Sequence, residues 1–151
     1  MTKFRLVCSL AVASIVTFGA VASHAGEADI KYRKEVMTAI GGHMGSIATI
    51  LKTGAGDVKD IELHAKAMAD LAKISMHIFP KNSSEMDGDT KAKMAIWDNP
   101  ADFKKVSEAF VTEADKLAKV SMSGDKAAIG KQLGMLGKNA CKACHKEYKS
   151  K

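Results

Sequence analysis

Apolar residues recur at intervals of three and four in four separate stretches of this chain, which is the pattern of helices that bury one face. The four stretches cover approximately residues 28–52, 57–79, 99–120 and 125–149. The first of them places Met37, Ile40 and Met44 on one stripe. Beyond the first 25 residues, no stretch alternates apolar and polar residues over the length of a strand. The sequence therefore predicts an all-α protein built from four helices.

Turn-forming residues separate the four predicted helices. Gly54 follows the first helix, Pro80 ends the second, and "SMSGD" ends the third. Asn99 and Pro100 suit the N-cap and the first helical position of the third helix. The connection over residues 81–99 is long and holds a short apolar run, "MAIW", that predicts about one helical turn. Two short links and one long link predict an antiparallel four-helix bundle in a single domain.

The first 25 residues have the three parts of a secretory signal peptide. Lys3 and Arg5 precede an apolar run over residues 6–22, which closes on the small-x-small triplet "SHA". The run is short for a membrane anchor, and no basic cluster follows it. We expect cleavage after Ala25, which leaves a four-helix-bundle domain over residues 26–151 that matures outside the cytoplasm.

Loss of the signal peptide would remove one cysteine and two cations. Cys8 lies before most of the apolar run and leaves with the signal, so the mature chain keeps only Cys141 and Cys144. The remaining 21 basic and 17 acidic residues give a net charge of +4. The lysines are scattered among acidic residues, and no basic run is interleaved with aromatic residues. We therefore expect no nucleic-acid partner, and no integral membrane segment after cleavage.

The stretch "CKACHKEYK" at residues 141–149 carries the chemistry of the chain. On a helix, Cys141, Cys144 and His145 occupy positions i, i+3 and i+4 and project to the same side. Two thiols can form thioethers with the vinyl groups of a haem while the adjacent imidazole binds the iron. We expect one covalently attached haem c per chain, with Cys141 and Cys144 as anchors and His145 as an iron ligand.

Two other uses of a Cys-x-x-Cys pair fit this chain less well. A redox dithiol sits at the N-terminal end of a helix, where the dipole lowers the pKa of the first thiol, whereas this pair lies near the C-terminal end of the last predicted helix. A structural zinc ion needs four ligands, and the mature chain has no further cysteine. His43, His64 and His77 are isolated in the sequence and fit surface or satisfied positions better than ligand positions.

Glycine is frequent inside two of the predicted helices, where each glycine costs up to about 1 kcal/mol relative to alanine. The positions are Gly41, Gly42 and Gly45 in the first helix and Gly130, Gly134 and Gly137 in the fourth. Either neighbouring helices pack closely at these positions, or a large flat group lies against them. The residues alone leave both explanations open.

These motifs together resemble the cytochrome c prime family, the four-helix-bundle haem proteins of bacterial periplasms. "CKACHKEYK" is similar to the ending of that family, with an aromatic residue three positions after the ligating histidine and a basic residue next to it. "YRKEVMTAIGGHMGSI" resembles its first helix, and "FPKNSS" followed by "AIWDNPADF" resembles its long connection. The resemblance covers nearly all of the mature chain and implies a periplasmic protein whose bundle encloses the haem.

The resemblance also implies roles for residues outside the motif. In six-coordinate members a methionine of the first helix binds the iron, and Met37 falls at that position, followed by the glycine-rich "GGHMG" typical of this branch. Met44, two turns further along, is a weaker candidate. An arginine at the position of Arg33 approaches a haem propionate in the family, and a solvent-facing arginine near the start of the helix is the alternative. Trp97 and Phe103 are expected to pack as core beside the haem pocket or at the end of the bundle.

Two functions follow from the two branches of the family. With Met37 bound, the iron is closed to other ligands and the protein transfers single electrons in the periplasm, which is the main prediction. With an apolar residue over the iron, the protein is five-coordinate and binds nitric oxide or carbon monoxide. We expect no enzymatic activity in either case. Redox partner proteins of a periplasmic electron-transfer chain are the expected partners, and the sequence leaves a homodimer open.

Overall fold

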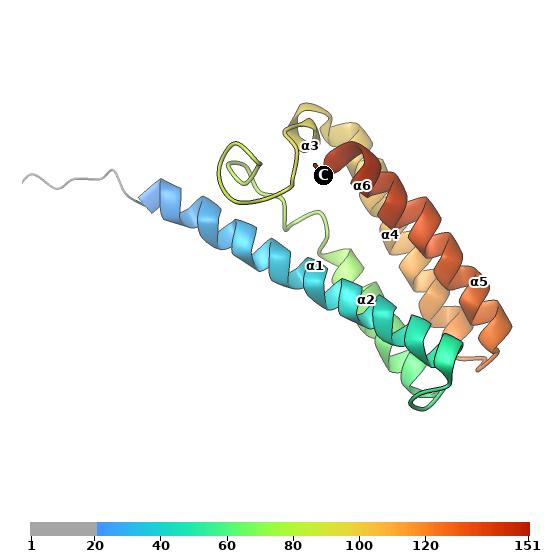
Figure 1. Ribbon diagram of the computed structural model, residues 1–151. Coiled ribbons are helices and arrows are strands. Elements are labelled where there is room, and N and C mark those ends of the chain that lie inside the picture. Colours follow the sequence, from blue (N-terminus) through green and yellow to red (C-terminus); the bar gives the residue numbers. More distant parts are fainter. Residues whose placement is uncertain (1–20) are drawn as a thin grey trace, which may run out of the picture.

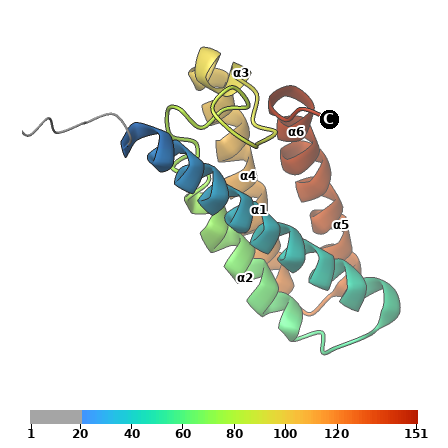
Figure 2. The same ribbon diagram turned by 60° about the vertical axis from the view of Figure 1, so that its left-hand side comes forward.

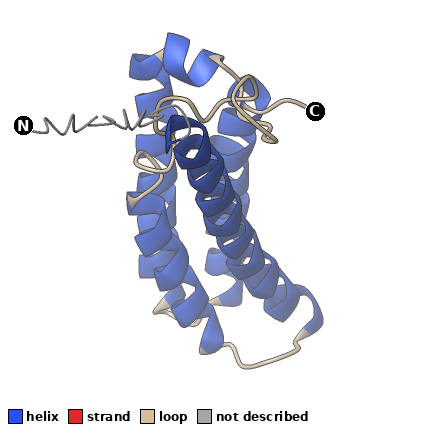
Figure 3. Cartoon of the chain, turned by 90° about the vertical axis from the view of Figure 1, so that its left-hand side faces the viewer, coloured by secondary structure: helices blue, strands red, loops and turns tan. Residues whose placement is uncertain are grey.

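The computed structural model describes the backbone of residues 21–151 and the side chains from residue 26 onward. In this range it contains helices and turns but no strand (Figure 3). In chain order the helices are α1 (Val21–Thr53), α2 (Asp60–Lys73), α3 (Ala95–Asp98), α4 (Pro100–Ser121), α5 (Lys126–Leu136), the π-helix η1 (Gly137–Lys142) and α6 (Ala143–Tyr148). The last three follow one another without a break and form the predicted fourth helix. The prediction of an all-α four-helix bundle is confirmed.

The long helices form two antiparallel pairs, α1 with α2 and α4 with α5, and α2 packs against α4 to join them (Figure 1). The α1–α2 turn and the α4–α5 turn lie at one end of the bundle, whereas α3, α6 and the C-terminus lie at the other. α1 contacts α5, but no Cα atom of α1 comes within 8 Å of a Cα atom of α6. The two helix pairs therefore separate toward the C-terminal end (Figure 2).

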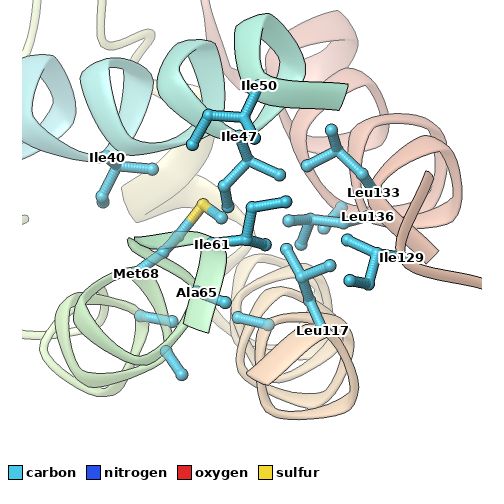
Figure 4. Close-up of a cluster of buried hydrophobic side chains, with 14 of the residues drawn as sticks. Ile40, Ile47, Ile50, Ile61, Ala65, Met68, Leu117, Ile129, Leu133 and Leu136 are labelled. Carbon is cyan, nitrogen blue, oxygen red and sulfur yellow. The ribbon is translucent and has the colours of Figure 1, made fainter. Parts of the chain in front are cut away.

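A core of aliphatic side chains fills the bundle where the helices are close together (Figure 4). Ile47 of α1, Ile61 of α2, Leu117 of α4 and Ile129 of α5 are all fully buried and point toward one another. Burial of one such side chain contributes about 1.5–3 kcal/mol. The apolar stripes predicted from the sequence thus face this core.

Two of the predicted helix starts are confirmed. Pro100 occupies the first turn of α4, directly after Asn99, although the Asn99 side chain makes no capping hydrogen bond. Asp125 caps α5 because its carboxylate accepts hydrogen bonds from the backbone N–H groups of Ala127 and Ala128. The short helix α3 also occurs in the "MAIW" run, as predicted.

The second helix is shorter than predicted. α2 ends at Lys73, and residues 74–78 form turns even though the apolar spacing continues the stripe to Phe79. In these turns the backbone N–H groups of Ser75 and His77 donate to carbonyls three residues earlier, so the chain winds more tightly than an α-helix. Arg33 of α1 donates a hydrogen bond of 3.2 Å to the carbonyl of Ile78 and holds this segment against α1. The prediction of a helix as far as residue 79 is therefore wrong.

The first helix begins earlier than predicted. α1 includes Val21, whereas the apolar pattern predicts a helix only from about residue 28. Cys8 and most of the predicted signal peptide fall in residues 1–20, outside the described residues. Cleavage after Ala25 and the resulting domain boundary therefore stay predictions.

His43 of α1 and His64 of α2 face each other rather than standing alone. Their Nδ1 atoms are 2.9 Å apart, and their ring centroids are 5.2 Å apart. A hydrogen bond at this distance needs Nδ1–H on one ring and an unprotonated Nδ1 on the other. The pair is thus satisfied within the protein, as predicted, although spacing along one helix carries no information about the contact between two helices. His77 is exposed, in line with the prediction.

Close helix packing does not explain most of the mid-helix glycines. No heavy atom outside the helix backbone lies within 4 Å of a Cβ atom built on Gly41, Gly42, Gly45 or Gly134. Of the six glycines singled out in the sequence, only Gly137 has a tight contact, because such a Cβ would lie 3.2 Å from the methyl carbon of Met44. The close-packing explanation is therefore wrong for these four positions, of which Gly41 borders the cavity described below.

The C-terminal segment is tied to the long connection. Ala92 and Lys149 form an isolated antiparallel bridge, and the N–H of Lys93 donates a hydrogen bond of 3.1 Å to the carbonyl of Tyr148. These contacts join residues that are far apart in the sequence and hold the end of α6 in place. They fix the helix that carries the Cys-x-x-Cys-His motif.

Candidate haem site

A cavity of about 600 Å³ lies where the two helix pairs separate. Its wall is formed by α1, the segment after α2, the long connection, α4, η1 and α6, and more than half of the lining residues are apolar. The volume falls in the range of ligand and cofactor sites. All five residues that the sequence predicts to bind the haem line this one cavity, namely Arg33, Met37, Cys141, Cys144 and His145.

The Cys-x-x-Cys-His motif spans a change of helix type. Cys141 lies in η1, whereas Cys144 and His145 lie in α6. A π-turn is wider than an α-turn, and such turns are frequent at functional sites. The three side chains reach the same cavity, as the helical spacing predicts. The π-turn itself is not predicted by the sequence pattern, which treats residues 125–149 as one α-helix.

The two thiols of the motif are partly buried and are not joined by a disulfide. Burial raises the pKa of Cys141, and burial together with the neighbouring Cys141 raises the pKa of Cys144 to about 11. Both thiols therefore stay protonated at neutral pH, whereas disulfide exchange requires a thiolate. This environment argues against a redox dithiol, and burial is the main cause of the raised pKa values.

The imidazole of His145 reaches the cavity beside the positive charge of Lys149. Partial burial, and then the charge of Lys149, lower the pKa of His145. The neutral imidazole is the form that binds a metal ion. Within the described part of the chain, no group of three or more His, Cys, Asp or Glu side chains could hold a metal ion by itself. A structural zinc site is therefore not supported.

A further feature of the wall suits a large, flat prosthetic group. Gly41 borders the cavity, and a Cβ atom built on it would meet no other heavy atom within 4 Å. Together with the apolar lining, the paired thiols and the neutral imidazole, this open position fits haem c.

Arg33 is 3% exposed and lies on the α1 side of the cavity. Its terminal nitrogens donate four hydrogen bonds, to the carbonyls of Ile78 and Ser83 and to the hydroxyls of Ser83 and Thr90. Its guanidinium carbon also lies 4.9 Å above the centre of the Phe79 ring. Arg33 therefore fixes the connection between α2 and α3 against α1.

These four bonds use every hydrogen on the two Nη atoms of Arg33, so only its Nε–H remains for a haem propionate. Burial lowers the pKa of Arg33, an effect that the charge of Asp29 opposes. A solvent-facing arginine is excluded by the burial. The predicted contact with a propionate stays a prediction.

Met37 and Met44 both line the cavity from α1. Each is partly buried and packs against the aliphatic core. Met44 also reaches η1, where its methyl carbon approaches Gly137. These contacts give both methionines a packing role, and ligation of the iron by Met37 has no support beyond its place on the wall.

An aromatic cluster closes the cavity at the end of the bundle where α3 and α6 lie. Phe103 packs edge-on against Phe79 and Tyr148, with ring centroids 4.9 and 5.2 Å apart. Trp97 packs on the same cluster and donates its indole N–H to the carbonyl of Pro80 over 3.1 Å. The predicted core role beside the haem cavity is confirmed for Phe103, whereas Trp97 is partly buried, packs on the cluster and does not line the cavity.

Comparison with known proteins agrees with this geometry. A family model described as Cytochrome C' matches residues 28–149. The chain belongs to the cytochrome c′ family. It is 36% identical over 150 residues to the cytochrome c′ of Rhodospirillum rubrum, and the aligned region covers 99% of each chain. It is also 32% identical over 124 residues to cytochrome c-556 of Agrobacterium tumefaciens, which covers 82% of this chain and 98% of that one.

Solved structures of cytochromes c′ share the fold. A cytochrome c′ described by its ligand-controlled dimer dissociation has a TM-score of 0.76 at 29% identity, covering 83% of this chain and 97% of that one. A ferrous variant of cytochrome c prime from Alcaligenes xylosoxidans with bound NO has a TM-score of 0.74 at 28% identity, covering 83% and 96%. As a cytochrome c′, the protein carries covalently attached haem c, and the prediction of this cofactor is confirmed.

Over the described range, no helix of this family member combines the length and the apolar composition needed to cross a bilayer.

Tyr148 anchors the haem-bearing helix of this cytochrome c′ through a contact that sequence reasoning missed. The residue is 5% exposed, and its hydroxyl donates a hydrogen bond of 2.7 Å to the carboxylate of Asp102 in α4. Burial, and then the contact with Asp102, raise the pKa of Tyr148 to about 12. The only signal in the sequence is the aromatic residue three positions after His145.

Replacing Tyr148 with phenylalanine should lower the free energy of unfolding by about 1.5 kcal/mol, because the ring packing remains while a hydrogen bond to a charged group is lost. The pKa of Tyr148 in the folded protein exceeds its ordinary value of 10.0, so the stabilisation is complete below pH 10 and disappears as the pH rises through about 12. Urea unfolding of the haem protein at neutral and alkaline pH measures both effects. Tyr32→Phe is the control, because Tyr32 is exposed. Equal losses in the two variants would contradict the anchoring role.

Proposed function

We propose that the protein is a five-coordinate cytochrome c′ that binds nitric oxide or carbon monoxide at an open side of its haem iron. One observation carries the proposal: a solved cytochrome c prime with bound NO has the same fold over 83% of this chain at 28% identity.

In this proposal, the residues of the cavity have different roles. Cys141 and Cys144 form the thioethers, and His145 supplies the imidazole on the side of α6. When bound, the haem iron supplies the chemistry of reversible ligand binding. The apolar residues of α1 and α4 exclude water and disfavour charged ligands, which would lose their hydration there. Arg33 keeps the connection in place as part of the wall.

Single-electron transfer with Met37 as the sixth ligand is the second candidate. Met37 lines the cavity from α1, and no Cα atom of α1 is near one of α6, which leaves space for a haem between Met37 and His145. A thioether on the iron would raise the reduction potential and exclude gases. If this second function holds, the protein exchanges electrons with redox partner proteins.

Absorption spectra of the purified haem protein distinguish the two candidates. For an open iron we expect a high-spin spectrum and binding of carbon monoxide by the reduced protein. Both should survive Met37→Leu, since leucine keeps the apolar volume. Met44→Leu is the matched control in the same cavity. The proposal fails if the wild type is low-spin and refuses carbon monoxide, and if Met37→Leu removes a weak band at the red end of the oxidised spectrum.

Location and activity are part of the same proposal. The predicted signal peptide supports a periplasmic location. Because the proposed mechanism converts no substrate, we propose that the protein is not an enzyme. A homodimer is also proposed, because one solved relative is described by its ligand-controlled dimer dissociation.

A further inference from the structure

The wall of the haem cavity carries more positive than negative charge. Among the described residues, its cations are Arg33, Lys34, Lys91 and Lys149, and its only acidic side chain is that of Asp89. Most of the other residues on this wall are apolar. The four cations differ in whether the protein itself supplies them with a partner.

Two of these cations already have partners within the protein. The terminal nitrogens of Arg33 donate hydrogen bonds to backbone and hydroxyl oxygens, and these bonds use all of their hydrogens. The ammonium of Lys34 lies 3.0 Å from the carboxylate of Asp89. In the part of the chain that the structure describes, the ammonium groups of Lys91 and Lys149 form neither an ion pair nor a hydrogen bond. These two charges are therefore available to a group in the cavity.

The backbone holds Lys91 and Lys149 at the same edge of the cavity. Ala92 and Lys149 form the antiparallel bridge described above, and the N–H of Ser150 donates a hydrogen bond of 2.9 Å to the carbonyl of Lys91. The two lysines therefore come from neighbouring backbone segments, and both are exposed while they line the cavity. Like charges on paired segments repel each other, so a negatively charged partner at this edge would be stabilising.

The haem c of this protein brings such partners, because a haem carries two propionate carboxylates on the edge away from the vinyl groups that the two cysteines bind. A carboxylate beside an apolar wall needs water or a cation, and an ammonium gives it a strong, charge-assisted hydrogen bond. Arg33 has only its Nε–H left, and Lys34 is already paired. Lys91 and Lys149 are the remaining cations of the wall, and their two charges match the two carboxylates.

We infer that the ammonium groups of Lys91 and Lys149 bind the two propionates of the haem, and that they thereby raise its reduction potential. An ammonium beside the haem disfavours the additional positive charge of the ferric iron, and it also neutralises a carboxylate that would favour that charge. The pairing is the same whether the iron is open or bound by Met37, so it goes beyond the proposed function. Both lysines are positioning residues, because they contact the edge of the prosthetic group and not its iron.

The test compares the haem proteins of the wild type, Lys91→Leu and Lys149→Leu by redox titration and by resonance Raman spectroscopy. In each variant the ratio of reduced to oxidised haem at a fixed solution potential should fall about fivefold, because one positive charge beside the haem is lost. The bending vibration of the propionates should shift as well, since it responds to their hydrogen bonds. Lys91→Arg should keep both wild-type values, because a guanidinium also binds a carboxylate.

Lys93→Leu is the matched control. Lys93 has the same charge and lies in the same segment as Lys91, but it does not line the cavity, and its ammonium donates a hydrogen bond of 3.2 Å to the carbonyl of Glu147. A fall in the ratio that is equally large in Lys93→Leu, with a constant propionate vibration, would reduce the effect to general surface charge and overturn the inference. A propionate vibration that stays at its wild-type frequency in both Lys91→Leu and Lys149→Leu would overturn it as well.

Discussion

Replacing Cys141 and Cys144 together with alanine is expected to abolish covalent haem attachment. The two thiols line the same cavity as His145, and the described residues include no other cysteine that could form a thioether. Without the prosthetic group, a cavity of about 600 Å³ would lose the contacts that the haem makes with its apolar wall. The haem signal of the exported protein on a denaturing gel should fall to background.

Lys142→Ala is the matched control for the cysteine variant. Lys142 lies between the two cysteines but is exposed and does not line the cavity, so its replacement should leave the haem signal unchanged. Haem that stays with the double variant through denaturation would show that another residue holds it. Loss of haem in both variants would point to a general failure of export or folding.

Replacing Arg33 with methionine is expected to lower the free energy of unfolding by about 3 kcal/mol, because it leaves buried acceptors without a donor. The acceptors are the carbonyls of Ile78 and Ser83 and the hydroxyls of Ser83 and Thr90. Methionine retains much of the apolar contact with Phe79, so the loss reports mainly on the hydrogen bonds. Urea unfolding followed by haem absorbance measures the change.

Lys34→Met is the control for the Arg33 variant, because the same residue type is introduced at the neighbouring position. Lys34 and Asp89 form an ion pair of 3.0 Å whose side chains are 55% and 101% exposed. Such surface pairs contribute about 0–1 kcal/mol. If the two variants lose the same stability, Arg33 does not fix the connection.

The sequence predicts the helices of this fold well because their information is local. The apolar spacing identifies the faces that bury Ile47, Ile61 and Leu117, and the start of α5 follows from a capping side chain that contacts the next turn. The three residues of the haem motif also lie within two helical turns of one another. For these features, neighbours in the sequence are neighbours in space.

The features that could not be predicted depend on contacts between distant segments. The segment after α2 is held against α1 by the hydrogen bond from Arg33 to the carbonyl of Ile78, and these two residues are 45 positions apart. The contact between His43 and His64 joins two helices, and no periodic pattern encodes it. The bond from Tyr148 to Asp102 spans 46 residues.

The prediction that Met37 binds the iron shows the same limit for function. It came from the resemblance of one helix to a branch of the family, and the position of a methionine on a stripe fits packing and ligation equally well. The solved relative with bound NO favours an open iron.

The intact mass of the exported, purified protein is the most direct test of the haem site. We expect the mass of the chain without its signal peptide plus that of one haem, retained after denaturation and removed by neither acid nor organic solvent. A mass equal to that of the polypeptide alone, from cells that attach haem to other cytochromes c, would contradict the assignment of Cys141 and Cys144 as its anchors.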